Sequence, residues 1–339
     1  MILAGGLSTR LYPLTKQVPK PLVPVGGAPN AVHLIRYLKS YGFDEIIINV
    51  HYLADAITRT LGDGSKFGVR LEYSHEPELL GSAGGVKQVQ RFFGDEEFVV
   101  VGCDDLTDLA LDKLLEMHRS KRAIATIGLV EREKVDQYGV VVVDSDGRIT
   151  GFQEKPAIGT ERSKLVNTGI YAFSPEIFAR IPSSRFYDFG KEVFPELQAA
   201  GAAFYGFDSK SAYWCDIGTP DEYRRASADL VNGAFAIPKT RASGADPSAQ
   251  IAASATVDAN VWIGAGASIG RNVRIAGPSV IGDGVRIEDD AVLERSIVWE
   301  GATVERGATL RDTIVGANYT VRAGASLEGA VVANEAAVV

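Results

Sequence analysis

The last third of the chain repeats an aliphatic residue every six positions, and no other feature constrains the fold as strongly. The fourteen repeat positions are Ile251, Val257, Ile263, Ile269, Ile275, Ile281, Ile287, Leu293, Val298, Val304, Leu310, Val315, Val321 and Leu327. The period slips by one residue before Val298 and again before Val315. Such a hexad with small residues between the aliphatic ones predicts a left-handed parallel β-helix of about four to five triangular coils. A meander of ordinary hairpins is the alternative.

The first two thirds of the chain alternate short apolar runs with amphipathic stretches of helical length. This alternation predicts an α/β domain, a Rossmann-like fold with a mainly parallel mixed sheet. Residues 2–4, 45–50 and 98–101 are expected strands. Functional groups collect at the carboxyl ends of strands in such sheets, so we expect residues 5–10 and 104–108 to be neighbours.

The composition changes between these two regions. Residues 233–250 are rich in Gly, Ala, Ser and Pro, which is typical of a connector. We therefore predict a catalytic domain over residues 1–228, a linker over 229–250 and the β-helix over 251–339.

Charge and composition exclude several classes of partner. The chain of 339 residues has 35 Lys plus Arg against 43 Asp plus Glu, a net charge of −8, which argues against binding to nucleic acid or to an anionic membrane. No apolar run of about eighteen residues occurs and the start lacks a basic region, so a cytoplasmic protein is expected. The two cysteines, Cys103 and Cys215, are expected to be small core residues.

A glycine loop follows the first expected strand, in the run Leu3-Ala4-Gly5-Gly6-Leu7-Ser8-Thr9-Arg10-Leu11, with Pro19-Lys20-Pro21-Leu22 shortly after it. Paired glycines let backbone N–H groups approach a phosphate, while Ser8 and Thr9 add hydroxyl donors. Arg10 and Lys20 can neutralise phosphate charge. The run is neither a Walker A loop nor a Rossmann fingerprint, and an ordinary turn is the alternative.

These motifs resemble the sugar-1-phosphate nucleotidyltransferases, whose signature is a GG-x-(S/T)-TRL loop followed by PKPL. The resemblance continues through Tyr213-Trp214-Cys215-Asp216-Ile217-Gly218-Thr219-Pro220. It is strongest to the bacterial mannose-1-phosphate guanylyltransferase branch, through Leu80-Gly81-Ser82-Ala83-Gly84 and Asn49-Val50-His51-Tyr52-Leu53. It implies that an NTP and a sugar 1-phosphate give an NDP-sugar and pyrophosphate, with GTP and mannose 1-phosphate favoured. UTP, dTTP or ATP with glucose 1-phosphate, or a silent regulatory homologue, are the alternatives.

The resemblance also implies roles for individual residues. Mg²⁺ would be shared by Asp104 and Asp216, although Gly102-Cys103 replaces the usual Asn-Gly pair. The implied catalytic residues are Arg10, Lys20, Asp104 and Asp216; the nucleotide-binding ones are Leu3, Ala4, Gly5, Gly6, Ser8, Thr9, Glu76 and Gly81; those for the sugar phosphate are Gly139, Glu154, Lys155 and Asn167. Asp105 and Asp108 are interpreted as loop caps or solvated residues.

Glu76 bears on the choice of base. A carboxylate offers only acceptors, which suits the adjacent N1–H and N2–H donors of guanine and leaves other bases unpaired or repelled. A solvated loop residue before Pro77 is the alternative.

The four histidines all lie in the first half of the chain, and His33 and His118 are expected to be packing or surface residues on helices. Residues 251–339 contain none, which argues against an acyltransferase that uses a histidine base in the β-helix. We expect the β-helix to be structural or an assembly surface of a homo-oligomer. Trp262 and Trp299 are then either core residues or subunit contacts.

Overall fold

The computed structural model describes residues 1–237 and 240–334, and the chain divides into two compact units. One, here called the sheet unit, contains Met1–Leu7 and Leu34–Trp214. The other, the coil unit, contains Ser8–His33 and Cys215–Val339. The segment after the glycine pair therefore belongs to the same compact unit as the repeat region.

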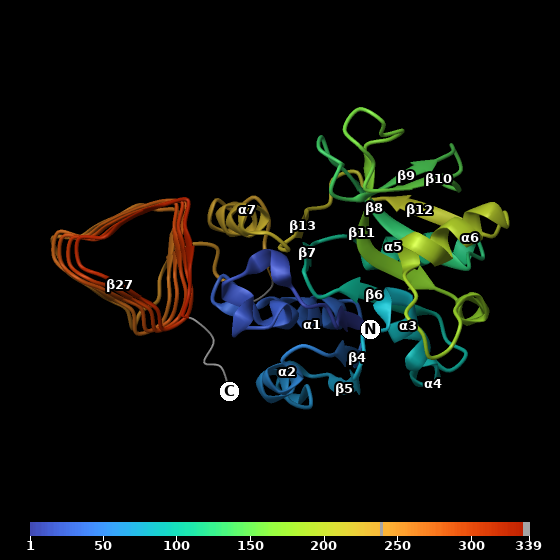
Figure 1. Ribbon diagram of the computed structural model, residues 1–339, viewed down its shortest axis with the longest axis horizontal. Coiled ribbons are helices and arrows are strands. Elements are labelled where there is room, and N and C mark those ends of the chain that lie inside the picture. Colours follow the sequence, from blue (N-terminus) through green and yellow to red (C-terminus); the bar gives the residue numbers. More distant parts are fainter. Residues whose placement is uncertain (238–239, 335–339) are drawn as a thin grey trace. The chain divides into compact units, whose positions relative to one another are not determined.

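One half of the main sheet is parallel (Figure 1). Its strands are, in spatial order, β6 (Phe98–Gly102), β1 (Ile2–Ala4), β4 (Glu45–Val50) and β5 (Arg70–His75). Ile2 is in register with Val101 on one side and Ile48 on the other. β1, β4 and β6 are largely buried aliphatic runs, as expected of a parallel sheet covered on both faces, whereas the edge strand β5 also carries polar and exposed residues. β1 and β6 are therefore adjacent and parallel, and their carboxyl ends lie at the same edge of the sheet.

The other half is largely antiparallel, which makes the sheet mixed. It contains β10 (Ile149–Glu154), β9 (Gly139–Val143) and β11 (Leu165–Phe173), with β8 (Ala125–Glu131) and β12 (Phe204–Asp208) beside β11. β11 pairs with β6, β8 and β9 in antiparallel fashion, and only β8 and β12 run parallel here. The pairing of β11 with β8 shifts register between Asn167 and Tyr171.

Helices pack beside this sheet and leave an aromatic core. The helices are α1 (Asn30–Ser40, which begins in the coil unit), α2 (Ala54–Leu61), α3 (Gly81–Gln88), α4 (Gln90–Phe93), α5 (Leu111–Ser120) and α6 (Phe194–Ala199), with short turns η4 (Ser65–Phe67), η5 (Pro175–Arg180) and η6 (Phe189–Val193). Phe93 stacks on Phe98 with ring centroids 4.0 Å apart, and Phe173 stacks on Phe189 at 4.8 Å. His118 of α5 is buried between Thr126 and Ser174, so its predicted packing role is confirmed.

The repeat region is a parallel β-helix whose coils have the triangular outline seen in Figure 1. The first of its three sheets contains β14 (Gly244–Ala245), β17 (Val261–Ile263), β20 (Ser279–Ile281), β23 (Ile297–Val298), β26 (Ile314–Val315) and β29 (Val331–Val332). The second contains β15 (Gln250–Ile251), β18 (Ser268–Ile269), β21 (Arg286–Ile287), β24 (Thr303–Val304) and β27 (Thr320–Val321). The third contains β16 (Thr256–Val257), β19 (Arg274–Ala276), β22 (Val292–Glu294), β25 (Thr309–Arg311) and β28 (Ser326–Glu328). The predicted fold class is confirmed.

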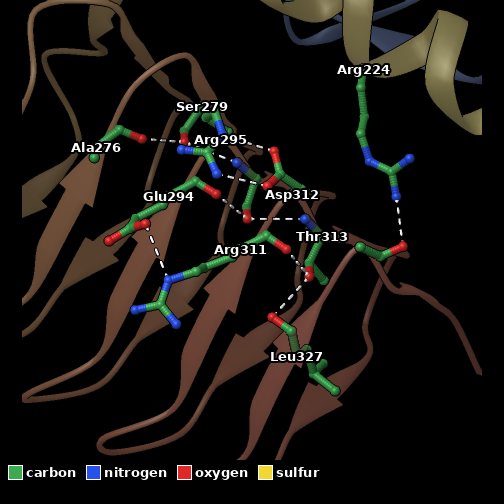
Figure 2. Close-up of polar contacts among 11 residues, drawn as sticks. Arg224, Ala276, Ser279, Glu294, Arg295, Arg311, Asp312, Thr313 and Leu327 are labelled. Carbon is green, nitrogen blue, oxygen red and sulfur yellow. Dashed lines mark hydrogen bonds and ion pairs between the residues drawn. The ribbon is translucent and has the colours of Figure 1, made fainter.

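The slips in the period occur at one corner of the triangle. Leu293 stacks on Leu310, which stacks on Leu327, so each of these coils has one residue fewer than the coil that joins Ile275 to Leu293. The shortened corner turns through Arg295 and Asp312, both at φ 46°. Their side chains form a two-pronged ion pair between coils (Figure 2). Charge pairing therefore stabilises a turn that an L-residue rarely adopts.

Buried hydroxyl groups satisfy the backbone just after the same corner. Ser279 Oγ accepts a hydrogen bond from Ser296 N at 3.0 Å, and Ser296 Oγ accepts one from Thr313 N at 3.2 Å. Thr313 Oγ1 in turn donates to the carbonyl oxygen of Arg311 (Figure 2). The aliphatic positions of the hexad fill the interior of the coils, with Ile275, Leu293 and Leu310 fully buried.

Trp262 and Trp299 are buried, so the first of their two predicted roles, that of core residues, is confirmed. Both lie outside the aliphatic interior of the coils, yet each is buried within its own chain. Trp299 packs against Tyr223 of α7 (Pro220–Val231) with ring centroids 6.3 Å apart, and a Cβ on Gly27 would meet the Trp262 ring at 2.3 Å. Tyr223 and Gly27 of the same chain thus pack against the outer face of the β17–β20–β23 sheet.

In the part of the chain that the structure describes, no helix has the length and apolar character needed to cross a membrane. The two cysteines, Cys103 and Cys215, are buried and form no disulfide, which confirms them as small core residues.

Candidate active site

A cavity of about 260 Å³ opens in the sheet unit at the carboxyl ends of β1, β4 and β5. It is lined by Leu3, Gly5, Gly6, Asn49, Glu76, Leu79, Gly81, Ser82 and Phe186. Five of these residues belong to the set predicted to bind the nucleotide. The lining is apolar except for a few polar side chains on one side, as in most small-molecule sites.

The polar side of the cavity is a hydrogen-bonded pair, Asn49 and Glu76. Asn49 Oδ1 accepts from Ala4 N at 2.8 Å, and Asn49 Nδ2 donates to Glu76 Oε1 at 2.8 Å. Glu76 Oε2 accepts from Leu80 N at 3.2 Å. Glu76 is 3% exposed, so its interpretation as a solvated loop residue is wrong. The network fixes an acceptor-only group beside the cavity.

Two glycines of the predicted set are required by close packing around this pair. A Cβ on Gly5 would lie 2.9 Å from Asn49 Nδ2. Gly81 has φ 74°, and a Cβ there would lie 2.5 Å from the carbonyl oxygen of Tyr187. A side chain at either position would therefore displace the wall of the cavity.

The predicted cationic residues gather around one carboxylate in the coil unit. Lys20, in η3 (Lys20–Leu22), is 7% exposed, and its Nζ lies 3.5 Å from Asp216 Oδ1. Arg10, in η1 (Thr9–Leu11), is more exposed and brings Nη2 to 3.8 Å from Asp216 Oδ2. A Cβ on Gly218 would lie within 3 Å of all three side chains. The glycine of the WCDIGTP motif therefore leaves the room that this cluster occupies.

Ser8 and Thr9 begin this segment. Ser8 has φ 57° and its carbonyl oxygen accepts hydrogen bonds from Leu11 N and Thr15 Oγ1. A left-handed residue followed by a turn of 3₁₀ helix, with a second such turn at η2 (Leu14–Lys16), bends the chain sharply after Gly6.

The three aspartates that follow β6, Asp104, Asp105 and Asp108, have different surroundings. Asp104, the predicted metal ligand, follows the strand and is half-buried. Asp105, which begins β7 (Asp105–Thr107), is buried, and its carboxylate accepts from Gly102 N at 3.0 Å and from Trp214 Nε1 at 3.0 Å. Its interpretation as a solvated residue is wrong, whereas the bond from Gly102 N agrees with the alternative of a loop cap, and the same carboxylate also ties the Trp214 ring to the end of β6. Asp108 is exposed and accepts from Tyr213 N.

Three of the residues predicted to bind the sugar phosphate meet in the antiparallel half of the sheet. Gly139 of β9 and Glu154 of β10 are register partners. A Cβ on Gly139 would lie 3.1 Å from Glu154 Oε2 and 3.5 Å from the Cβ of Asn167, which is on β11. Asn167 sits at the register shift of β11 and donates to Tyr171 Oη at 3.1 Å. Lys155 follows β10 at φ 46°, with an exposed side chain.

The Glu154 carboxyl group is held in a poorly solvated position. Its Oε2 atom lies close to the backbone of Gly139 and Gly190, although much of the side chain is exposed. Burial of the carboxyl tip raises the pKa of Glu154, while neighbouring Lys155 opposes the shift. The group is therefore protonated at a higher pH than an ordinary glutamate.

Sequence reasoning missed Asn49 and Phe186 as members of the nucleotide cavity. A signal for Asn49 was present, because it is the one polar residue in the buried run Ile46–Val50 of β4. Phe186 had no such signal, since it comes from a segment more than a hundred positions further along the chain. Within residues 1–237 and 240–334 no group of three or more His, Cys, Asp or Glu side chains is arranged to hold a metal ion.

Comparison with known proteins identifies the family to which this chain belongs. The sequence pattern of the family described as "Nucleotidyl transferase" matches residues 1–233, and that described as "EIF2B subunit epsilon LbH domain" matches residues 245–339. The chain therefore belongs to the nucleotidyl transferase family, and the resemblance found in the signature motifs is confirmed.

The individual relatives differ in their named substrates. A UTP–glucose-1-phosphate uridylyltransferase of Synechocystis sp. is 44% identical, covering 67% of this chain and 61% of its own length. A mannose-1-phosphate guanylyltransferase of Mycobacterium tuberculosis is 36% identical, covering 71% of this chain and 67% of its own length. The structure of a putative glucose-1-phosphate thymidylyltransferase from Bacillus anthracis, in complex with a sucrose, is similar with a TM-score of 0.60 at 27% identity, covering 67% and 92% of the two chains. The chain thus spans less than two thirds of the uridylyltransferase.

Proposed function

We propose that this protein transfers a nucleotidyl group from an NTP to a sugar 1-phosphate, giving an NDP-sugar and pyrophosphate. One observation carries the proposal: the sheet unit has two polar sites on the same sheet, one around Glu76 and one around Glu154. The strands that bear them lie on opposite sides of β6, and Asp104 follows β6 directly. A base site and a sugar site with a carboxylate between their strands suit an enzyme that joins two phosphate-bearing substrates.

The chemistry needs no covalent enzyme intermediate. A phosphate oxygen of the sugar 1-phosphate, already ionised at neutral pH, forms a bond to the α-phosphorus. The bond from that phosphorus to the bridging oxygen of the β-phosphate breaks, and pyrophosphate leaves with the electron pair. The chain then has to orient the two substrates and neutralise charge. Arg10 and Lys20 serve the triphosphate in this proposal, and Lys155 serves the phosphate of the sugar.

The residues present fit a divalent cation as cofactor. Asp104 and Asp216 offer carboxylate oxygens, the hard ligands that Mg²⁺ takes in ones or twos together with substrate phosphates. The space beside Gly218, which a Cβ would fill at 2.5 Å from Asp216 Oδ1, leaves that oxygen uncrowded by carbon. When bound, Mg²⁺ would stabilise the charge that develops on the phosphates. Asp104 and Asp216 are the residues proposed to hold it.

For the substrates we favour GTP and mannose 1-phosphate. The buried carboxylate of Glu76, held by Asn49 and Leu80 N, presents only acceptors beside the cavity. Guanine alone among the common bases has two adjacent donors on its Watson–Crick edge. The second candidate is UTP with glucose 1-phosphate, which the name of the 44% identical relative favours.

The test is pyrophosphate release measured for GTP, UTP, dTTP and ATP, each with mannose 1-phosphate and with glucose 1-phosphate. We expect the highest kcat/KM for GTP with mannose 1-phosphate. A preference for UTP or dTTP would refute the guanylyl assignment while leaving nucleotidyl transfer standing. No release with any pair, despite binding of NDP-sugar, would support a silent regulatory homologue.

A substitution then tests the base contact itself. Glu76→Gln supplies one donor and one acceptor, so the preference for GTP over UTP should narrow, chiefly through kcat/KM. A site built for a donor pair can discriminate by about 10⁴-fold, because a wrong base leaves the desolvated carboxylate unpaired. Glu78→Gln is the matched control, since Glu78 is exposed two positions further on. Equal preferences in the two variants would remove Glu76 from base recognition.

A further inference from the structure

We propose that Tyr223, held by Trp299 of the β-helix, is a positioning residue for Lys20. The inference rests on the proposed function, because Lys20 has a role there. It gives the β-helix a part in the reaction that its repeat alone does not indicate.

The first observation is a relay of hydrogen bonds within the coil unit. Trp299 Nε1 donates to Tyr223 Oη at 2.9 Å. Tyr223 Oη donates to the carbonyl oxygen of Pro24 at 2.6 Å. Tyr223 is 1% exposed and Trp299 is 2% exposed, so neither bond is exchanged readily for one to water. Both partners of a buried bond are costly to separate.

Pro24 lies four residues after Lys20, and the backbone between them is folded tightly. Leu22 N donates to the carbonyl oxygen of Pro19, and Val23 N donates to that of Lys20 at 3.1 Å. Pro24 then begins β2 (Pro24–Val25), which pairs with β3 (Ala28–Pro29) in a short hairpin. A displacement of Pro24 would therefore displace Lys20 as well, because one hydrogen-bonded turn of backbone connects them.

The hairpin tip is closely fitted on two sides. Gly26 and Gly27 both have positive φ. A Cβ on Gly26 would meet Leu230 of α7 at 2.5 Å, and one on Gly27 would meet the ring of Trp262 at 2.3 Å. The tip thus fits between α7 and the β-helix, where only glycine leaves enough room.

On its remaining side the β2–β3 hairpin is not closely packed. A cavity of about 170 Å³ is lined by Leu22, Pro24, Pro29, Tyr223 and Trp299, among others. The flanking residues Val23 and Val25 are buried, and their carbonyl oxygens accept hydrogen bonds from Asn30 N and His33 Nε2. The bond from Tyr223 Oη to the carbonyl oxygen of Pro24 is then the one that holds the hairpin on the side of the cavity.

Helix α7, which bears Tyr223, is held at its N-terminus and at its contact with the β-helix. Its N-cap is Thr219, whose Oγ1 accepts from Glu222 N, and Asp216 precedes that cap by three residues. The next residue, Arg224, donates to the carbonyl oxygen of Gly329 at 3.0 Å (Figure 2). Tyr223 therefore joins the β-helix, the segment after Asp216 and the segment after Lys20.

The experiment compares Tyr223→Phe and Trp299→Phe with Tyr319→Phe in the full chain. Tyr319 lies in the same unit, and its hydroxyl makes no hydrogen bond among the residues described. We expect kcat/KM to fall about tenfold in Tyr223→Phe and in Trp299→Phe, as a displaced charged group would cause, and to stay within about twofold in Tyr319→Phe.

Two further readouts separate positioning from loss of stability. In a Lys20→Ala background, Tyr223→Phe should cause almost no further loss, because no ammonium group is left to position. Amide exchange over residues 20–27, followed by mass spectrometry, should be faster in Tyr223→Phe than in Tyr319→Phe. The same tenfold loss in both backgrounds, or unchanged exchange, would overturn the inference. A wild-type protein without nucleotidyl transfer would instead refute the proposed function, and exchange would still decide whether Tyr223 anchors the hairpin.

Discussion

The β-helix and the mixed sheet place irregular backbone in different ways. In the β-helix each strand pairs with the strand 17 or 18 positions away, and Arg295 and Asp312 at the shortened corner form an ion pair with each other. In the mixed sheet, Lys155 has φ 46° directly after β10, and its side chain is exposed.

The difference teaches where to look for ligand-binding residues. An irregular position whose side chain is already paired has a structural explanation in the fold. An irregular position with an exposed charged side chain has no such explanation, and it becomes a candidate for binding. The predictions below test this distinction, beginning with the largest effect.

Both cores should be essential for stability, but a cavity made in the interior of the coils, away from Trp299, should leave the chemistry unchanged. Phe173→Ala removes a ring from the aromatic core of the sheet unit and should lower the free energy of unfolding by about 3–5 kcal/mol. Leu310→Ala in the coils should cost about 2–5 kcal/mol. Urea denaturation and kcat/KM are measured on each. We expect kcat/KM of folded Leu310→Ala to be unchanged; a loss as large as that of an active-site variant would contradict the distinction drawn above.

The carboxylates proposed for the metal should affect the chemistry without affecting the cores. Asp104→Asn and Asp216→Asn should each lower kcat by about 10²-fold or more, since metal stabilisation of developing charge contributes several kcal/mol. Asp221→Asn is the control, because Asp221 is an exposed carboxylate on α7 paired with Arg224. Turnover that persists in excess chelator would exclude the proposed metal site.

Lys155 tests an irregular position directly. Lys155→Ala should raise KM for the sugar 1-phosphate by about tenfold or more, as loss of a charge-assisted contact would, with NTP binding little changed. Lys164→Ala removes a surface lysine that pairs with Glu133 and serves as control. If titration showed that NTP affinity collapses in Lys155→Ala, the two phosphate sites would have to be exchanged.

The smallest effect expected is in the pH dependence of sugar binding. Because the pKa of Glu154 is raised from its usual 4.5, the carboxylate loses its acceptor character at a higher pH than an ordinary glutamate. KM for the sugar 1-phosphate should therefore rise as the pH falls toward 5, a few-fold at most. Glu154→Gln should keep only the rise that protonation of the sugar phosphate itself causes, because a phosphate monoester has a second pKa of about 6. Identical profiles for the wild type and Glu154→Gln would show that Glu154 is not the group that senses the sugar.

More of the fold could be predicted from the sequence in the β-helix than in the mixed sheet. The hexad assigns the aliphatic positions from Ile263 to Val321 to the interior of the coils, where they are found, although Ile251 at the first position is exposed. The mixed sheet has no such period. Its strands β4 and β6 were evident as buried apolar runs, whereas the antiparallel part around β11 depends on contacts between distant segments that no local pattern records.

The candidate site shows the same limit. Gly5, Glu76 and Lys20 could be singled out because their motifs are local, yet the partners that fix them could not. Asn49 donates a hydrogen bond to Glu76, 27 positions away in the sequence, and Trp299 donates one to Tyr223, 76 positions away. Whether Asp105 is solvated or buried likewise depended on Trp214, which is 109 positions away.

The shortened corner also makes the β-helix adjustable in length. Because each of the later coils takes 17 residues and contacts only the coil above and below it, a further 17-residue coil placed after Val315 would extend the stack by one strand spacing of about 4.8 Å. Such an insertion lies beyond Trp299 in the chain. The domain can thus serve as a spacer whose reach is set in whole-number steps, independently of the anchored end.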